Sequence, residues 1–426
     1  MEPGPSAHAL TRLGHVPSAW SALPGRYSPA VAKDRATPGS QTSLREANRA
    51  RIVSAVQQRG SLTQVELAGV TGLSAATISN IVKELAGAGI LHTSPTSRSG
   101  RRAQEVTLAR NLGLVAGVHF GERSLRVAVA DVAHRVVAEQ RLPLPPEHRA
   151  DSGLDRVAML VEEMVDSLGA SLGEVIAVGV GIPAPVDVRT GQVSSLGLLR
   201  GWDEVDVPEV LGRRLGVAVT VDNDANLGAL AEVRLGIARG LQDVAYLRVS
   251  HGVGVGLVLG GRLFHGRSGG AGELGHLVIN EGGPLCRCGN QGCLETAVGS
   301  SELLSRLQGT HGHLTLRDVV AQAQHGDDEC REVIADAGRH LGVALAALCT
   351  LLDPEMVVVG GDLAHAGDIL LDPLREVLDG RTLPSTAGPV AVEASALGDQ
   401  AEVRGALVLA LDTYDVGAPH APGGLL

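Results

Sequence analysis

The first regular pattern of apolar and polar residues begins at Ser43 and predicts short helices. Ser43 with Glu46, and Thr63 with Glu66, have the spacing of a capping box, which marks a helix start. Apolar residues then recur at the spacing of a helix face: Leu44, Ala47, Ile52, Val53 and Val56, followed by Val65 and Ala68. A turn at Val70–Leu73 precedes Ser74, which we expect to cap a third helix.

The third predicted helix has one apolar face and one polar face. Its apolar face has the i, i+3, i+4, i+7 spacing and consists of Ile78, Ile81, Val82 and Leu85; Gly87 and Gly89 end the helix. Helix, turn and helix together are typical of a module whose second helix enters the major groove of DNA. The residues that we expect to face the groove are Ser74, Ala75, Thr77, Ser79 and Asn80, with Lys83 near a phosphate.

A basic hairpin is predicted after the third helix. Ile90-Leu91 begins one strand, and the second strand runs through Val106 and Leu108. The connection carries Arg98, Arg101 and Arg102, which can reach phosphates or a narrow minor groove. Residues 41–110 are therefore predicted to form a winged helix-turn-helix. The alternative is a three-helix protein-interaction module with a solvated basic loop.

From Val115 onward, short apolar runs alternate with helical patterns, which predicts an α/β protein. The expected strands are Val115–Phe120, Leu125–Ala130, Val175–Val180, Val217–Val221, Val244–Val249, Val253–Leu259, Met356–Val359 and Val390–Glu393. The expected helices are Leu154–Leu168, Leu227–Leu235, Leu341–Leu352 and Glu402–Leu411. Polar clusters follow several of these strands, where open α/β sheets bind their ligands.

The charges are distributed unevenly along the chain. Residues 41–110 contain nine Lys/Arg and four Asp/Glu, a net +5; the whole chain is −11, so the remainder carries −16. A small basic module on an acidic body indicates a polyanionic partner for the module alone, and chance composition is the alternative. Hydrophobic residues make up 44% and aromatic residues only 2%, so the core is expected to consist of aliphatic side chains.

The two ends of the chain lack periodic patterns. Residues 1–40 are rich in Pro, Gly, Ser and Ala and predict a disordered tail; residues 416–426 predict a flexible C-terminus. The N-terminus lacks a secretory pattern, and the apolar run Leu341–Leu352 is too short to span a bilayer. We expect a cytoplasmic protein without a membrane partner, associated with the nucleoid when it binds DNA.

A cluster of sulfur and nitrogen ligands lies at residues 276–293: His276, Cys286, Cys288 and Cys293. Thiolates and imidazole hold structural zinc tetrahedrally, and a full set of four protein ligands leaves no position for a catalytic water. Glycines between the cysteines suit a tight turn. Three buried cysteines that lie close by chance are the alternative. The two other cysteines, Cys330 and Cys349, are expected to be buried thiols. Five cysteines used in this way are no disulfide framework, and a zinc thiolate site fits a reducing compartment.

A second polar cluster, Asp222-Asn223-Asp224-Ala225-Asn226, follows a predicted strand. A carboxylate beside an amide can accept from and donate to sugar hydroxyls, and Asp224 can take a proton from one. The alternative is an Asx-rich turn that caps the next helix. The presence of Glu273, His276 and Glu295 in the same chain favours a polyol pocket.

These motifs together resemble the ROK family (repressors, open reading frames, kinases). The matching stretches are G-I-P-A-P-V-D at 181–187, D-N-D-A-N at 222–226, G-E-L-G-H at 272–276, C-R-C-G-N-Q-G-C-L-E at 286–295 and L-D-P-E-M-V-V-V-G-G at 352–361. Residues 44–108 resemble the winged helix-turn-helix of the repressor branch.

The resemblance implies an actin-like, two-lobed sugar-kinase fold in residues 111–415. It also implies that His276 touches both zinc and sugar, and that Asp224 holds the position of the catalytic base in family kinases. The implied sugar contacts are Asn223, Asp224, Glu273, His276 and Glu295.

Two loops depart from the phosphate-binding pattern of the family's kinases. The first, Asp-x-Gly in such kinases, begins with His119 and adds the negative charge of Glu122, which opposes an anionic ligand. The second, usually Gly-Thr-Gly, is Ser250-His251-Gly252. Phosphoryl transfer depends on positioning and charge neutralisation, so these changes predict the loss of kinase activity.

We therefore predict a sugar-responsive transcriptional regulator, a repressor, that is not an enzyme. Its effector would be a sugar or sugar phosphate, and a homodimer or homotetramer would bind a pseudo-palindromic DNA operator. The first alternative is an active ATP-dependent sugar kinase with Asp224 as its base. Others are a ligand-independent DNA-binding or scaffold protein, and a zinc enzyme in which one of the four ligands is absent from the metal.

Overall fold

The computed structural model describes residues 41–98, 101–109, 112–145, 149–187, 189–194, 201–203, 205–383 and 388–414. The chain divides into two units, Met1–Glu46 and Ala47–Leu426, and each is described by itself. In the first unit the described residues are the start of helix α1, where Leu44 is exposed. The predicted tail at 1–40 and flexible end at 416–426 lie outside the described residues.

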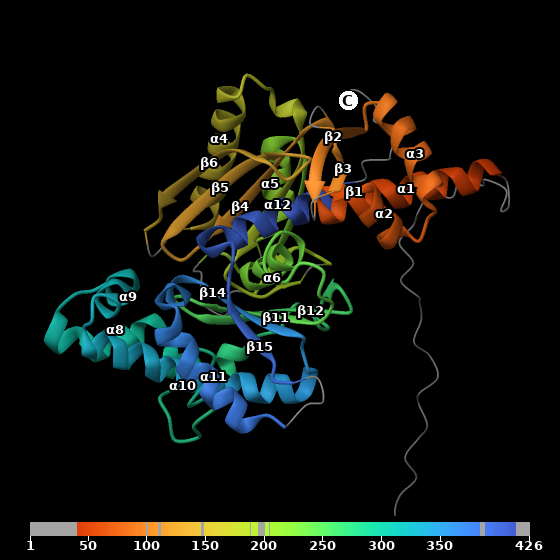
Figure 1. The fold of residues 1–426 in the computed structure, drawn as a ribbon. Helices are drawn as coiled ribbons and strands as arrows, with labels where there is room; N and C mark the ends of the chain where they lie inside the picture. The colour runs from red at the N-terminus through yellow and green to blue at the C-terminus, as the bar shows by residue number, and fades with distance from the viewer. Residues whose placement is uncertain are drawn as a thin grey trace, which may run out of the picture. The chain divides into compact units, whose positions relative to one another are not determined.

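The N-terminal part of the second unit is a winged helix-turn-helix (Figure 1). From Ala47 on, its elements are the rest of α1(Gln41–Arg59), then β1(Leu62–Thr63), α2(Gln64–Thr71), α3(Ala75–Gly87), β2(Leu91–Arg98) and β3(Arg101–Leu108). The three strands pair in the order β1-β3-β2. Thr63 and Glu66 form the predicted capping box, and Ser74 caps α3 through the Thr77 amide. The apolar face of α3 is buried, as predicted.

Some N-terminal predictions are wrong. Ser43 is not a helix cap, because α1 already includes Gln41. Leu44 and Val65 were assigned to a buried helix face, but they are 65% and 80% exposed. Both residues lie in the first turn of their helices. The apolar spacing extends into this turn, although these two side chains do not pack against the core. Periodicity alone does not show where packing stops.

The first lobe of the following α/β part is a mixed sheet in the order β10-β7-β4-β5-β6. Its strands are β4(Leu114–Phe120), β5(Ser124–Asp131), β6(Val136–Pro143), β7(Val175–Ile182) and β10(Ala218–Asn223). Helices α4(Ala150–Ser167) and α5(Val207–Leu215) share a core with it, as does the small ribbon β8(Val186–Asp187) and β9(Gln192–Val193). Phe120 and Trp202 meet edge to face there, with ring centroids 4.8 Å apart.

The second lobe contains a sheet in the order β13-β12-β11-β14-β15. Its strands are β11(Val244–Val249), β12(Val253–Leu259), β13(Arg262–Leu263), β14(Met356–Gly360) and β15(Ala391–Ala394). Its helices are α7(Glu295–Val298), α8(Ser300–His311), α9(Leu316–Gln324), α10(Asp328–Leu352) and α11(Asp368–Arg381). Short 3-10 turns of this lobe lie at Leu274–His276 and Asp362–Ala366; two others lie at Leu172–Glu174, before β7 of the first lobe, and at Gly398–Gln400, after β15.

Helix α10 contains the predicted buried run but is longer than it. By length and composition alone, its 25 residues would be able to cross a membrane, so the premise that the segment is too short is wrong. Its most apolar window is 61% buried inside the protein. A Cβ added at Gly338 would lie 2.4 Å from the Leu370 carbonyl oxygen of α11, so the two helices touch backbone to backbone. This packing is that of a core helix.

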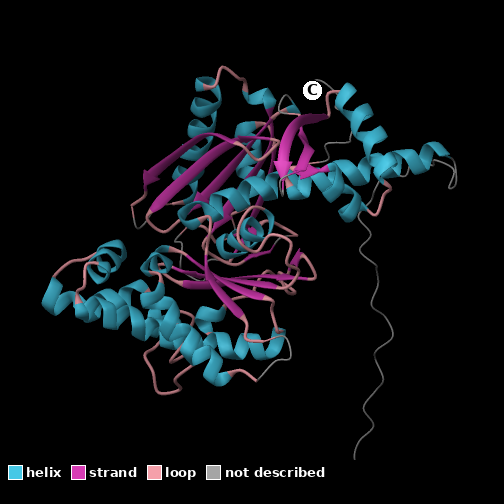
Figure 2. Ribbon diagram, in the orientation of Figure 1, coloured by secondary structure: helices cyan, strands magenta, loops and turns pink. Residues whose placement is uncertain are grey.

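Helices α6(Asp224–Arg234) and α12(Ala401–Thr413) lie between the two large sheets (Figures 1 and 2). Glycines let α12 approach closely: a Cβ at Gly179 of β7 would lie 1.9 Å from the Ala406 carbonyl oxygen. A Cβ at Gly405 would lie equally close, at 1.9 Å, to the Leu227 carbonyl oxygen of α6. The predicted class, a two-lobed α/β protein behind a winged helix-turn-helix, is confirmed.

Candidate functional site

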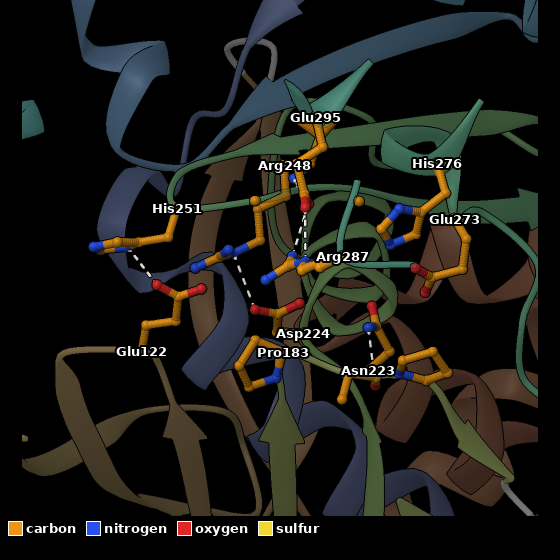
Figure 3. Close-up of a pocket in the computed structure, with 15 residues that line it drawn as sticks. Glu122, Pro183, Asn223, Asp224, Arg248, His251, Glu273, His276, Arg287 and Glu295 are labelled. Atoms are coloured by element: carbon orange, nitrogen blue, oxygen red, sulfur yellow. Dashed lines mark hydrogen bonds and ion pairs between the residues drawn. The ribbon is translucent and has the colours of Figure 1, made fainter. Parts of the chain in front are cut away.

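One pocket brings together all five predicted sugar contacts (Figure 3). Asn223 and Asp224 lie at the junction of β10 and α6, Glu273 and His276 at a short 3-10 turn, and Glu295 at the start of α7. These residues come from loops that are far apart in the sequence and meet where the strands of both lobes end. The rest of the lining is Glu122, Pro183, Ala184, Pro185, Arg248, His251, Gly252, Val253, Gly254 and Arg287.

Asn223 is the N-cap of α6 as well as a lining residue. Its Oδ1 accepts from the amides of Ala225 and Asn226 at 2.8 and 3.4 Å, and its Nδ2 donates to the Ala184 carbonyl oxygen at 3.1 Å. The capping alternative and the pocket interpretation are therefore compatible. Because these bonds fix the side chain before any ligand arrives, Asn223 can present its second Nδ2 hydrogen in one direction.

Asp224 is buried and lies between two basic side chains. Its Oδ2 is 3.3 Å from Arg248 Nε and 3.6 Å from His119 Nε2. Burial raises the pKa of Asp224, but Arg248 and then His119 outweigh it, so the net pKa lies below its ordinary value. A carboxylate held in this way stays ionised and has little tendency to take a proton from a hydroxyl.

The sequence reasoning missed Arg248, which lines the pocket, and its partner Glu402, which lines the adjacent cavity. Arg248 Nε lies 2.9 Å from Glu402 Oε1, so the guanidinium joins Asp224 of α6 to Glu402 of α12. The available signal was one arginine in the otherwise uncharged strand Val244–Val249. Its partners are 24 and 154 positions away in the sequence, which no local pattern reveals.

Glu273 and Glu295 experience different electrostatic surroundings. Arg287 binds Glu295 through two contacts of 2.8 Å, so that carboxylate is already paired. Burial raises the pKa of Glu273 to about 7, and the charges of Asp224 and Glu295 add to the effect. Near neutral pH, Glu273 is therefore a mixture of a hydrogen-bond acceptor and a protonated donor. Arg287, inside the cysteine motif, is a further residue that the sequence reasoning missed.

The four predicted metal ligands form one cluster. Cys286 Sγ lies 3.5 Å from His276 Nδ1, Cys288 Sγ lies 3.6 Å from Cys293 Sγ, and all four ligand atoms lie within 4.8 Å of one another. Neighbouring ligands of a tetrahedral zinc ion are separated by about 3.5–3.8 Å, which follows from metal–ligand distances of about 2.0–2.3 Å. The donor set and its spacing fit such an ion. His276 belongs to both the cluster and the pocket.

A glycine makes the tight turn of this cluster possible. Gly292 has φ +67°, and a Cβ there would lie 1.5 Å from the Asn280 carbonyl oxygen. Any side chain at Gly292 would therefore displace the segment that carries Cys293. The sequence expectation of a glycine-dependent turn agrees with this geometry.

The residues that replace the phosphate loops pair with one another. Glu122 of the first loop lies 3.8 Å from His251 of the second, so the two lobes meet at this point (Figure 3). His119 is buried against Asp224, and Ser250 donates to Asp362. An adjacent cavity of about 230 Å³ is lined by these loops and by Arg123, Arg126, Arg141, Arg248 and Arg317.

The predicted DNA contacts on α3 lie on its solvent side. Ser74, Ala75, Ser79, Asn80 and Lys83 are exposed, and Thr77 is half-buried beneath the Ser74 hydroxyl, 2.8 Å away. In the wing, Arg98 pairs with Arg101 at the end of the β2–β3 ladder. The side chains of Arg98, Arg101 and Arg102 lie outside the described residues, so their DNA contacts remain predictions.

Comparisons with known proteins match both parts of the chain. The sequence model of the ROK family matches residues 115–413, and that of a winged helix-turn-helix DNA-binding domain matches residues 45–91. The chain is 26% identical to the xylose repressor of Caldicellulosiruptor bescii, over 88% of this chain and 97% of that protein. It is 30% identical to the transcriptional dual regulator NagC of Escherichia coli K12, over 82% of this chain and 89% of NagC.

Solved structures with the same architecture include a regulator and a kinase. A ROK family transcriptional regulator, a homologue of the E. coli MLC protein, superposes with a TM-score of 0.71 at 25% identity, covering 88% of this chain and 97% of its own. A ROK glucokinase from Streptomyces griseus, in complex with glucose and AMPPNP, gives a TM-score of 0.63 at 29% identity. The match covers 70% of this chain and 100% of the glucokinase chain.

Proposed function

The chain belongs to the ROK family, and on that basis we propose that it is a DNA-binding transcriptional repressor whose operator affinity changes when a sugar binds between its two lobes. The winged helix-turn-helix in the same polypeptide supports the DNA-binding half of the proposal. The convergence of Asn223, Asp224, Glu273, His276 and Glu295 on one pocket supports the sugar-binding half. A sugar that stabilises one arrangement of the lobes would change operator affinity only if the two arrangements bind it differently.

The ion pair between Asp224 and Arg248 is the observation that most favours a regulator over an enzyme. In a kinase this carboxylate would accept a proton from the sugar, and here Arg248 makes it a weaker base by lowering its pKa. Glu122 and His251 face each other where a nucleotide phosphate would need donors. Both features favour a pocket that binds sugar without transferring phosphate.

The kinase alternative is tested directly, because ROK glucokinases also resemble this chain. Purified protein with ATP, Mg²⁺ and glucose, xylose or N-acetylglucosamine is expected to release no ADP above a protein-free control. Turnover that disappears in Asp224→Asn would revive the kinase alternative.

We propose zinc as the metal of the His276–Cys293 cluster, in a structural role. Bound zinc would supply a fixed tetrahedral anchor, since three thiolates and an imidazole occupy every position. The protein's own contribution is then to orient His276, whose Nδ1 faces the thiolates while its ring lines the pocket. Binding of metal would in this way pre-organise one wall of the sugar site.

For DNA, we propose that residues 41–110 form the reading module and that residues 111–415 form the sensor. A homodimer or homotetramer would place two copies of α3 in successive major grooves of a pseudo-palindromic operator. Contacts to bases would come from Ser74, Ala75, Thr77, Ser79 and Asn80, and contacts to phosphates from Lys83, Arg98, Arg101 and Arg102. The working location would be the cytoplasm, at the nucleoid when bound to DNA.

The test begins with selection of bound duplexes from random-sequence DNA, followed by titration with glucose, xylose, N-acetylglucosamine and their phosphate esters. One of these ligands is expected to change the affinity for the selected duplex about 5- to 150-fold, the range of typical coupling energies.

Lys83→Ala should weaken binding to all duplexes and lower the slope of log affinity against log salt by about 1. Arg213→Ala, at an exposed position of α5, is the matched control. Failure to enrich any duplex would sink the proposal.

A further inference from the structure

The last turn of α1 is attached to the α/β part of the chain by its own carbonyl oxygens. His134 Nε2 lies 3.0 Å from the Gln57 carbonyl oxygen, Arg234 Nη1 donates to that of Gln58 at 3.0 Å, and Arg239 Nη2 to that of Arg59 at 2.6 Å. Carbonyls at a helix C-terminus lack partners within the helix and attract positive charge. These contacts therefore satisfy the end of α1 and hold the winged module in place.

Helix α12 adds a second set of contacts to the same turn. Gln57 Nε2 donates to the carbonyl oxygens of Leu411 and, at 2.8 Å, Tyr414. Asp412 of α12 binds Arg234 Nη2 at 3.0 Å. The ends of α6 and α12 thus reach α1 together, with one ion pair between them.

The opposite ends of the same two helices meet at Arg248, which lines the sugar pocket. Asp224 begins α6 and Glu402 lies in the first turn of α12, and Arg248 binds both carboxylates. Helix α6 has 11 residues, which corresponds to roughly 16 Å along its axis. Both helices therefore run from Arg248 at the pocket wall to α1, and an ion pair or shared arginine joins them at each end.

Close backbone contacts leave these helices little freedom to move independently. Besides the contact of Gly405 with the Leu227 carbonyl oxygen, a Cβ at Gly256 of β12 would lie 2.1 Å from the Ala225 carbonyl oxygen of α6. No flexible side chain separates the backbones at these points. Because close-packed interiors transmit displacement, a shift of Asp224 at one end is expected to move Arg234 at the other.

We propose that α6 and α12 act as one coupling element between the sugar pocket and the winged module, with Arg234 as the positioning residue at the α1 end. The proposal rests on the proposed function. A sugar hydroxyl that binds Asp224 competes with Arg248 for the same carboxylate and changes the link between Asp224 and Glu402. The two states are then α1 held by Arg234 and α1 released from it, and the sugar biases their populations.

Amide hydrogen exchange of the full chain tests this coupling without knowledge of the operator. Zinc-supplemented protein would be compared with and without millimolar glucose, xylose or N-acetylglucosamine. In the wild type, a sugar that protects the segment around Asn223 and Asp224 is expected to change exchange at residues 57–61 as well. Protection of the pocket without any change at residues 57–61 would overturn the inference and leave the proposed function standing. Absence of pocket protection with all three sugars counts against the proposed function itself.

Variants of Arg234 separate a positioning role from a merely structural one. Arg234→Gln is expected to keep sugar affinity within about twofold of the wild type while the response at residues 57–61 is lost. Arg234→Lys, which keeps the charge and one donor, should restore part of the response. Arg262→Gln is the control, since Arg262 is exposed and lines the same surface groove as Arg234. An undiminished response in Arg234→Gln would refute the assignment of this residue.

Discussion

Arg248 shows how one residue can change the chemistry of a neighbouring carboxylate. Its strand, β11, is otherwise apolar and buried, and the arginine places a permanent positive charge between Asp224 and Glu402. The side chains of these three residues are between 5% and 15% exposed, so their charges are poorly screened by water. The surroundings of Asp224, rather than its presence, decide what this carboxylate can do.

Replacement of Arg248 by methionine would leave two buried carboxylates without their shared cation. We expect the free energy of unfolding to fall by about 3–5 kcal/mol, the usual cost of breaking a buried charge pair. Urea denaturation measures this loss, and Arg248→Lys should lose less because it keeps the charge. An unchanged midpoint in Arg248→Met would mean that the three side chains are not coupled in solution.

Glu273 predicts a pH-dependent stability of defined sign. Its pKa is raised to about 7 in the folded chain from an ordinary 4.5, so its contribution is fully present below about pH 4.5 and is lost as the pH rises through 7. Glu273→Gln cannot ionise, and it should be more stable than the wild type at pH 8 by about 1–3 kcal/mol and by much less at pH 5.

Thermal unfolding of Glu273→Gln at the two pH values, with the exposed Glu281→Gln as control, checks the expected difference. The same variant should bind sugar more weakly, because the amide cannot serve as a charged acceptor. Equal stability of variant and wild type at both pH values would contradict the raised pKa.

At the scale of single elements, local sequence patterns predicted most strands and the buried helices. The start of α6 was placed at Leu227 instead of Asp224, because D-N-D-A-N was interpreted as the end of a strand, with a capping turn only as the alternative. Strand β6 was missed, since it is an edge strand whose side chains alternate irregularly between half-buried and exposed. Arg248 and Glu402 were missed because contact across the fold, not spacing, defines them.

The metal cluster was predictable because all its donors lie within 18 residues of one another.

Cys288→Ser should lower bound zinc from one ion per chain to none and abolish sugar binding, because His276 loses its fixed orientation. Elemental analysis and calorimetry measure the two effects, and Cys349→Ser, a buried thiol of α10 outside the cluster, is the matched control. Retention of zinc by Cys288→Ser would exclude Cys288 as a ligand.

At the scale of the whole molecule, the attachment of α1 to the α/β part should depend on pH. His134 has φ +64°, and its Nε2 faces the Gln57 carbonyl oxygen while its buried Nδ1 has no hydrogen-bond partner among the described residues. Burial lowers the pKa of His134 below 6.5, so the ring stays neutral where an unfolded chain would already bind a proton. Stability from this contact is therefore lost as the pH falls below about 6.5.

Amide exchange at residues 57–61 is expected to rise between pH 7.5 and 5.5, after correction for the intrinsic rate. His134→Asn should remove most of this dependence, because asparagine tolerates the left-handed backbone and does not titrate. A profile that is identical in the variant would assign the pH response to another group.

The glycine contacts of α12 also bear on how this protein can lose its activity through mutation. Positions 117, 179 and 405 lie outside the pocket lining and the winged module, yet an added methyl group at each would meet the main chain of a neighbouring element. In a saturation screen for variants that no longer repress, substitutions that abolish repression should therefore include changes at these buried glycines. A search limited to exposed residues or to residues of the pocket would not find them.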